Sequence, residues 1–169
     1  MKKQLAIMIM VFLTIGAYAQ HDHKAHASNS QEKGSPSFKD EKLNSAYMHY
    51  LHLKDALVSS NAGEAKKAAG ELQKSLESLS NGTKAAAEAE KISASSDLKI
   101  QRTSFSPLSN EMTTLVKASK LASGSLYVEY CPMANNNQGA FWLSNEKEIK
   151  NPYFGEMMLK CGSVKEILQ

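Results

Sequence analysis

The chain has 169 residues, of which 42% are hydrophobic, 7% aromatic and 22% charged, and this length suits one compact domain. With 9 glycines, 4 prolines and 2 cysteines, the composition excludes collagenous, low-complexity and disulfide-dense proteins. Of the 20 basic residues, Lys2 and Lys3 belong to a leader, and the others nearly balance 17 acidic residues, which gives no electrostatic basis for binding nucleic acid.

Residues 1–19 have the pattern of a secretory signal peptide. Two lysines precede an apolar run from Leu5 to Ile15, and Ala17-Tyr18-Ala19 forms the small-x-small sequence that a signal peptidase cleaves. The run is shorter than the ~20 residues needed to cross a bilayer, so we expect no membrane anchor. The leader predicts export, to the periplasm in a Gram-negative bacterium, and a mature protein without a membrane span.

Residues 20–37 contain no large apolar residue and are rich in Ser, His, Lys and Asn, which predicts a disordered tail. The tail holds His21, His23 and His26, with Asp22 between the first two. Flexible imidazoles beside a carboxylate bind Cu(II), Ni(II) or Zn(II) without needing a fold. These histidines are therefore a candidate secondary metal site, and a merely solubilising tail is the alternative.

Residues 38–169 are expected to form one helical metal-binding domain. Apolar residues that step by three and four predict a helix over about residues 39–59, and the same spacing predicts a second helix after a capping box at Asn61 and Glu64. Asn81-Gly82 is expected to stop this second helix. Because the link between them is short, the two helices should lie antiparallel.

Two further helices are predicted before residue 124. Residues 83–96 are rich in alanine and favour a helix with a thin buried face. A fourth apolar stripe runs from Leu98 to Ala122, and Pro107 is expected to kink or restart this helix near Ser106.

The aromatic residues crowd the last third of the chain, where the predicted structure changes. Residues 126–130 and 140–143 read as two short strands joined by an Asn-rich loop, which predicts a hairpin. A short helix that carries Met157, Met158 and Cys161 is expected to follow and to end at Gly162. The predicted fold is therefore mainly α, an antiparallel bundle of about four helices with a small C-terminal β-hairpin and a short helix.

Thiols and thioethers gather in this C-terminal unit. Cys131 and Met133 follow the first predicted strand, and Met158 and Cys161 lie about thirty residues later. Thiol and thioether sulfur together favour Cu(I), because thioethers are too soft to hold Zn(II) well. A site built on Cys131, Cys161 and Met133, with help from Met158, would suffice for this ion.

The same cysteines allow a different interpretation. In an oxidising compartment, Cys131 and Cys161 could form one disulfide that joins the hairpin to the last helix. The protein would then be a secreted protein–protein interaction module without metal, with an aromatic patch around Trp142 and Tyr153 as its contact surface. Methionines such as Met158 are also common as core filling.

His49 and His52 lie on the first predicted helix, at least 100° around its axis from the buried stripe centred on Tyr50. They belong either to a solvated face or to a site that they complete together with the sulfur atoms. The sequence contains no phosphate-binding glycine loop, nucleophile elbow or zinc-protease motif, so we expect a binding protein and not an enzyme.

Four linked segments resemble the signature of a bacterial domain-of-unknown-function family. They are Tyr-Cys-Pro-Met-Ala at 130–134, Gly-Ala-Phe-Trp-Leu-Ser at 139–144, Ile-Lys-Asn-Pro-Tyr-Phe-Gly at 149–155 and Met-Leu-Lys-Cys-Gly at 158–162. The similarity extends upstream through 50–58 and 101–109, so it covers about residues 42–168.

Members of that family are exported as small proteins or fused to the periplasmic adaptor subunits of heavy-metal (copper/silver) resistance-nodulation-division efflux pumps. The resemblance implies a helical periplasmic domain associated with export of copper or a related metal, with Cys131, Met133 and Cys161 as candidate ligands. It also implies a possible partner, an adaptor or other subunit of such a pump. The predicted function is therefore to buffer Cu(I) or to deliver it to an efflux system.

Overall fold

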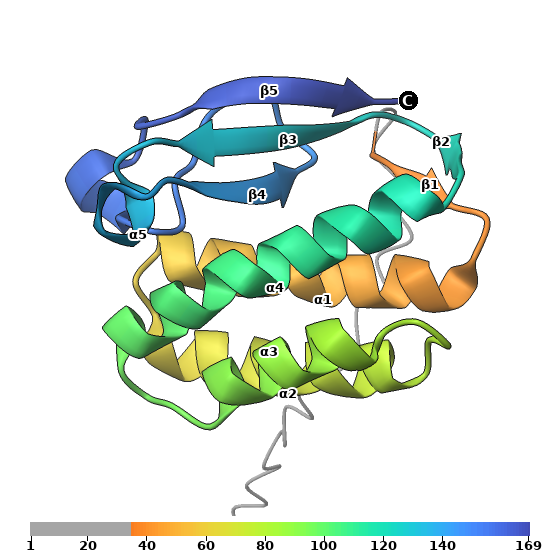
Figure 1. Ribbon diagram of the computed structural model, residues 1–169, viewed down its shortest axis with the longest axis horizontal. Helices are drawn as coiled ribbons and strands as arrows, with labels where there is room; N and C mark the ends of the chain where they lie inside the picture. Colours follow the sequence, from red (N-terminus) through yellow and green to blue (C-terminus); the bar gives the residue numbers. More distant parts are fainter. Residues whose placement is uncertain (1–34) are drawn as a thin grey trace, which may run out of the picture. The chain divides into compact units, whose positions relative to one another are not determined.

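The computed structural model describes residues 35–169 (Figure 1). Outside the described residues lie the predicted signal peptide and the three tail histidines, His21, His23 and His26. Of the tail predicted over residues 20–37, the structure describes the last three residues, and Ser37 already belongs to strand β1 (Ser37–Phe38).

Four long helices make up the first part of the described chain, as the apolar spacing predicted. Asp40, Asn61 and Asp97 each accept hydrogen bonds from backbone N–H groups of the turn that follows, which fixes the start of three of these helices. The helices are α1 (Glu41–Val58), α2 (Ala62–Glu77), α3 (Thr83–Ser93) and α4 (Leu98–Ala118).

The described residues form three layers (Figure 1). The sheet lies on α1 and α4, and these two helices lie on α2 and α3. Ala65, Ala68 and Ala69 of α2 are fully buried, and their small side chains let neighbouring helix axes come close. The predicted antiparallel helical bundle is confirmed.

α4 runs through Pro107 as one helix, so of the kink or restart expected near Ser106 the restart is wrong. Proline has no N–H, which leaves the carbonyl group of Thr103 without its usual helical donor. Both Pro107 and Thr103 are exposed, and a carbonyl on the outer side of a helix can bind water instead. The loss of one hydrogen bond on this face therefore does not end the helix.

The C-terminal third folds into a three-stranded antiparallel sheet with β3 in the centre. β3 and β4 form the predicted hairpin, and the unpredicted strand β5 adds to the other edge of β3. A separate two-stranded ladder joins β1 to β2. The strands and the short helix between β3 and β4 are β2 (Leu121–Ser123), β3 (Leu126–Cys131), α5 (Ala134–Asn137), β4 (Ala140–Ser144) and β5 (Ser163–Leu168).

The predicted short helix near the C-terminus is a single 3-10 turn, η1 (Gly155–Met158), and Cys161 lies beyond it. The buried side chain of Asn151 explains this difference. Its amide group donates to the Cys161 carbonyl at 2.7 Å, and the Asn151 backbone N–H donates to the Leu159 carbonyl at 2.8 Å. Because Asn151 takes these two carbonyls, the chain turns toward β5 and does not continue as a helix.

The largest buried side chains fill the space between the sheet and the helices beneath it. Trp142 of β4, Tyr50 of α1 and Phe105 of α4 are all fully buried, and the Tyr50 and Phe105 rings stack with their centroids 5.4 Å apart. None of the helices described for residues 35–169 has the length and apolar character that a bilayer span requires.

Candidate functional site

The fold brings the two cysteines of the chain together. Cys131 is the last residue of β3 and is fully buried, and Cys161 lies two residues before β5 and is partly buried. Because Tyr130 pairs with Ser163 in the antiparallel ladder, the residues just beyond this pair also approach one another. Both cysteines are free thiols, and we refer to them as the thiol pair.

The acidity of Cys161 reflects its neighbours. Hydrogen bonding with the Cys131 sulfur raises the pKa of Cys161, and partial burial of the thiol adds to this rise. The backbone N–H of Met133 acts on the same thiol in the opposite direction and lowers its pKa. Together with the pairing of Tyr130 and Ser163, these effects indicate that the Cys161 thiol lies close to Cys131.

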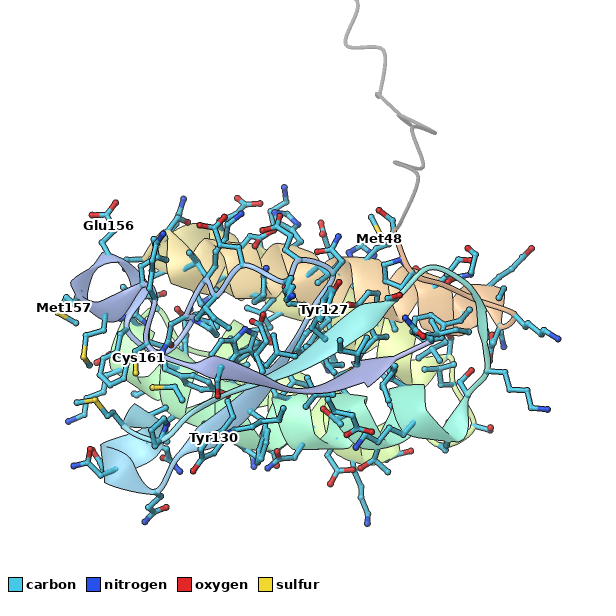
Figure 2. All side chains as sticks on the ribbon, turned by 90° about the horizontal axis from the view of Figure 1, so that it is seen from above. Met48, Tyr127, Tyr130, Glu156, Met157 and Cys161 are labelled. Carbon is cyan, nitrogen blue, oxygen red and sulfur yellow. The ribbon has the colours of Figure 1, made fainter. Side chains whose placement is uncertain are left out.

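Three methionines line one groove at this end of the molecule. The groove has a volume of about 620 Å³ and lies between the start of α4, the loop with α5, and η1. Figure 2 shows several sulfur atoms gathered at the end where Met157 and Cys161 are labelled. We call it the methionine groove, after Met133, Met157 and Met158.

The structure places the two histidines of α1 against α2. His49 Nδ1 lies 3.5 Å from a carboxylate oxygen of Glu71, and His52 Nε2 lies 2.9 Å from one of Glu64. Tyr50, which is 100° or more around the helix from both histidines, reaches the sheet. His49 and His52 are therefore not brought to the thiol pair, and the hypothesis that they complete a sulfur site has no geometric support here.

The thiol pair by itself offers two sulfur donors. Within residues 35–169, no three His, Cys, Asp or Glu side chains come close enough together to hold a metal ion. A metal bound by Cys131 and Cys161 would therefore need a thioether, a backbone group or a two-coordinate geometry. Two thiolates with a nearby thioether suit Cu(I), which accepts two to four soft ligands, and suit hard cations poorly.

The aromatic patch expected around Trp142 and Tyr153 is not a surface. Trp142 is fully buried and Tyr153 is 7% exposed, and their rings pack edge to face with centroids 6.0 Å apart. The Tyr153 hydroxyl donates to the Phe141 carbonyl at 2.6 Å, which fixes this ring under the sheet. These two aromatics belong to the core because both strands and the 151–155 turn close over them.

Arg102 joins the segment before η1 to the helices by hydrogen bonds. Its Nε donates to the Pro152 carbonyl at 2.9 Å, and its Nη2 donates to the Leu57 carbonyl and to Ser60 Oγ, each at 2.9 Å. These bonds join the end of α1, the start of α4 and the turn that leads to Cys161. The first two residues of the upstream segment 101–109 thus have a packing role, since Gln101 is also fully buried and its amide group donates to the carbonyls of Ala62 and Ser95.

A buried carboxylate near the middle of the sheet was not predicted. Glu129 of β3 is fully buried, and within the described residues neither of its carboxylate oxygens has a hydrogen-bond partner. Burial raises the pKa of Glu129 to about 7, although the positive charge of the buried Lys54 opposes the rise, and so does the indole N–H of Trp142, which lies near the carboxylate but outside hydrogen-bond geometry. The sequence signal for this buried carboxylate was the position of Glu129 among apolar residues of a predicted strand. A strand with one face in solvent commonly carries a charged residue on that face, so this position did not by itself predict burial.

Comparison with known protein families gives one match, which covers mainly the helices. Residues 46–124 match a family model described as a protein of unknown function, DUF3347, which runs from the first turns of α1 to the end of β2. The segment that carries Cys131, Met133 and Cys161 lies outside this match. No curated protein and no solved structure matches the chain. The match supports the similarity to a domain-of-unknown-function family.

Proposed function

We propose that this protein binds Cu(I) through Cys131 and Cys161, with Met133 as a thioether ligand. The observation that carries the proposal is the adjacency of two free thiols that are thirty positions apart in the sequence. Cu(I) is the cargo of such a site. The residues supply two thiolates after loss of their protons, and the thioether adds a soft third ligand without adding charge.

The surroundings of the thiol pair support a site that opens to one side. Cys131 is fully buried, whereas Met133 is 47% exposed. Cys161 has an exposure between these extremes, and the register of β5 against β3 brings it close to Cys131. An ion could therefore reach the buried thiol from the Met133 side, and the low polarity around Cys131 would exclude water from the bound state.

The role in the cell follows from the leader and from the resemblance of the C-terminal motifs. The signal peptide predicted over residues 1–19 would export the chain, to the periplasm in a Gram-negative bacterium. There the protein would buffer Cu(I) or deliver it to an adaptor or another subunit of a metal efflux pump. The tail histidines, His21, His23 and His26, would offer a separate site for Cu(II).

The adjacency of the thiols also favours a second candidate, a disulfide between Cys131 and Cys161. Such a bond would tie β3 to the segment before β5 and would leave no thiolate for a metal. Since Trp142 and Tyr153 are buried, an interaction module of this kind would have to use another surface. The two candidates differ in a simple property, the number of titratable thiols in the exported protein.

The test is a Cu(I) competition titration against a chromophoric chelator, made on exported protein before and after mild reduction. We expect one tightly bound Cu(I) per chain after reduction, and its loss in the Cys131→Ser, Cys161→Ser double variant. The control is Met48→Leu, because Met48 is 65% exposed on α1 and supplies no predicted ligand. Circular dichroism establishes that each variant is folded.

Either of two results would overturn the proposal. The first is the absence of tight Cu(I) binding by the reduced wild-type protein. The second is Cu(I) binding of the same strength and stoichiometry in the double cysteine variant. Exported protein with no titratable thiol before reduction would favour the disulfide candidate for the cellular state.

A further inference from the structure

The methionine groove exposes side chains that proteins usually bury. Met157 is 77% exposed and Met133 is 47% exposed, and both line the same groove as Met158. Methionines that are exposed in a groove differ from methionines that fill a core, because a ligand from solvent can reach their sulfur atoms. In Figure 2, Met48, which is also exposed, lies at a distance from this end of the molecule.

The wall of the groove is held in an unusual backbone conformation. Asn135, Asn136 and Asn137 line it, and all three have positive φ angles, of 52°, 55° and 64°. Left-handed conformations cost free energy in residues other than glycine and persist where the surrounding structure imposes them. The loop that positions Met133 is therefore preformed.

The charges of the groove also restrict its ligand. Its lining residues include no carboxylate, and its charged members are Lys99 and Arg102. Arg102 is bonded to backbone carbonyls, whereas Lys99 is exposed at the rim. Without anionic oxygen ligands the groove does not suit Ca²⁺, Mg²⁺ or other hard cations, while neutral thioethers bind soft monovalent ions.

From this arrangement we infer that the methionine groove is a second, thioether-only site for a soft monovalent ion, Cu(I) or Ag(I), formed by Met133, Met157 and Met158. The site shares Met133 with the proposed thiol site and needs neither cysteine. Its relation to the thiol pair rests on the proposed function: Met133 lines the groove and lies two residues after Cys131, the last residue of β3. An ion held by the three thioethers would thus already have one of the ligands of the thiol site, Met133.

Transfer from the groove to the thiol pair needs no oxidant or reductant. The ion keeps its charge and exchanges thioether ligands for thiolates, and each thiol that becomes a ligand releases a proton. Because thiolates bind Cu(I) more tightly than neutral thioethers, the direction of transfer is from the exposed groove to the buried pair.

The experiment separates the groove from the thiol pair. In the Cys131→Ser, Cys161→Ser background, the methionine methyl groups are labelled with carbon-13 and titrated with Ag(I) while their resonances are followed by NMR. We expect the methyl resonances of Met133, Met157 and Met158 to shift together and to saturate at one ion per chain. The resonance of the exposed Met48 is the internal control and should stay in place.

Two variants complete the test. Met157→Leu keeps the volume of the side chain but removes its sulfur, so the remaining two methyl shifts should weaken. Lys99→Gln removes the positive charge at the rim, so it should lower the Ag(I) concentration at half-saturation. Folding of both is checked by the unchanged methyl resonance of the buried Met112.

The inference is overturned if the groove resonances do not move, or if Met48 shifts in parallel with them at the same Ag(I) concentrations. Saturable shifts in this background, combined with a wild-type protein whose cysteines contribute nothing to Cu(I) affinity, would leave the groove site standing and remove the proposed thiol site. Groove resonances that do not move, combined with Cu(I) binding by the wild-type protein that depends on its cysteines, would remove the groove site and leave the thiol site standing.

Discussion

The hydroxyl group of Tyr50 bonds α1 to the sheet through Leu143. Its oxygen accepts a hydrogen bond from the Leu143 backbone N–H at 3.0 Å, and it forms a second hydrogen bond with Ser109 Oγ at 2.8 Å. Tyr50 is fully buried, and burial raises the pKa of its phenol above the ordinary value, so the hydroxyl keeps its proton. One side chain thus joins two helices and a strand below the sheet.

Replacing Tyr50 by Phe should lower the free energy of unfolding by ~1–3 kcal/mol, because the buried N–H of Leu143 and the hydroxyl of Ser109 each lose a partner. The measurement is urea unfolding followed by circular dichroism. Tyr127→Phe is the matched control, since Tyr127 is only partly buried on β3. Equal effects of the two substitutions would contradict the linking role of Tyr50.

Glu129 should make stability fall as the pH rises. Burial raises its pKa to about 7 from 4.5, so the folded protein binds more protons at this site than the unfolded chain between these two pH values. Stability from this group is greatest below pH 4.5, declines through that interval and stays reduced above about pH 7. Glu129→Gln, which resembles the protonated acid, should remove this decline.

The expected result is that Glu129→Gln stabilises the protein by ~1–3 kcal/mol at pH 8, the cost of a buried charge without hydrogen bonds, and has little effect at pH 5. Chemical unfolding at both pH values measures the difference. Glu166→Gln serves as control, because Glu166 is exposed on β5. A stabilisation that is the same at pH 5 and pH 8 would show that Glu129 does not titrate in this interval.

Asn151 should position the thiol pair without touching an ion. It is fully buried, its side chain holds the Cys161 carbonyl, and its Oδ1 accepts from the Tyr153 N–H at 2.8 Å. Asn151→Leu removes both bonds and frees the segment before β5. If the proposed copper site exists, its Cu(I) affinity should drop by about tenfold to a hundredfold, as when groups that orient ligands are lost.

The control for this substitution is Asn110→Leu at an exposed position of α4. Cu(I) affinity is measured by chelator competition under conditions in which both variants are folded, and thermal unfolding is recorded in parallel. A folded Asn151→Leu protein that binds Cu(I) as tightly as the wild type would contradict the positioning role, whatever its loss of stability.

Local signals determined most of the architecture. The apolar period of three and four residues and the capping box at Asn61 identified four helices whose starts the structure confirms closely, because these patterns act within a few residues of chain. The fourth helix ends at Ala118, before the predicted Ala122, which lies in β2. The same reasoning found the hairpin of β3 and β4. It missed β5, since residues 163–168 are mostly exposed and lack the alternation of a half-buried strand.

The candidate site was predictable in its chemistry and not in its arrangement. From the sequence alone, the soft sulfur ligands and the leader already pointed to an exported protein and a copper hypothesis. Only the tertiary structure decided that Cys131 and Cys161 meet, that His49 and His52 face the carboxylates of α2, and that Trp142 is core. These outcomes depend on the register of β5 against β3 and on the hydrogen bonds of Asn151 and Arg102, which join segments far apart in the chain, whereas residue type and spacing report only on near neighbours.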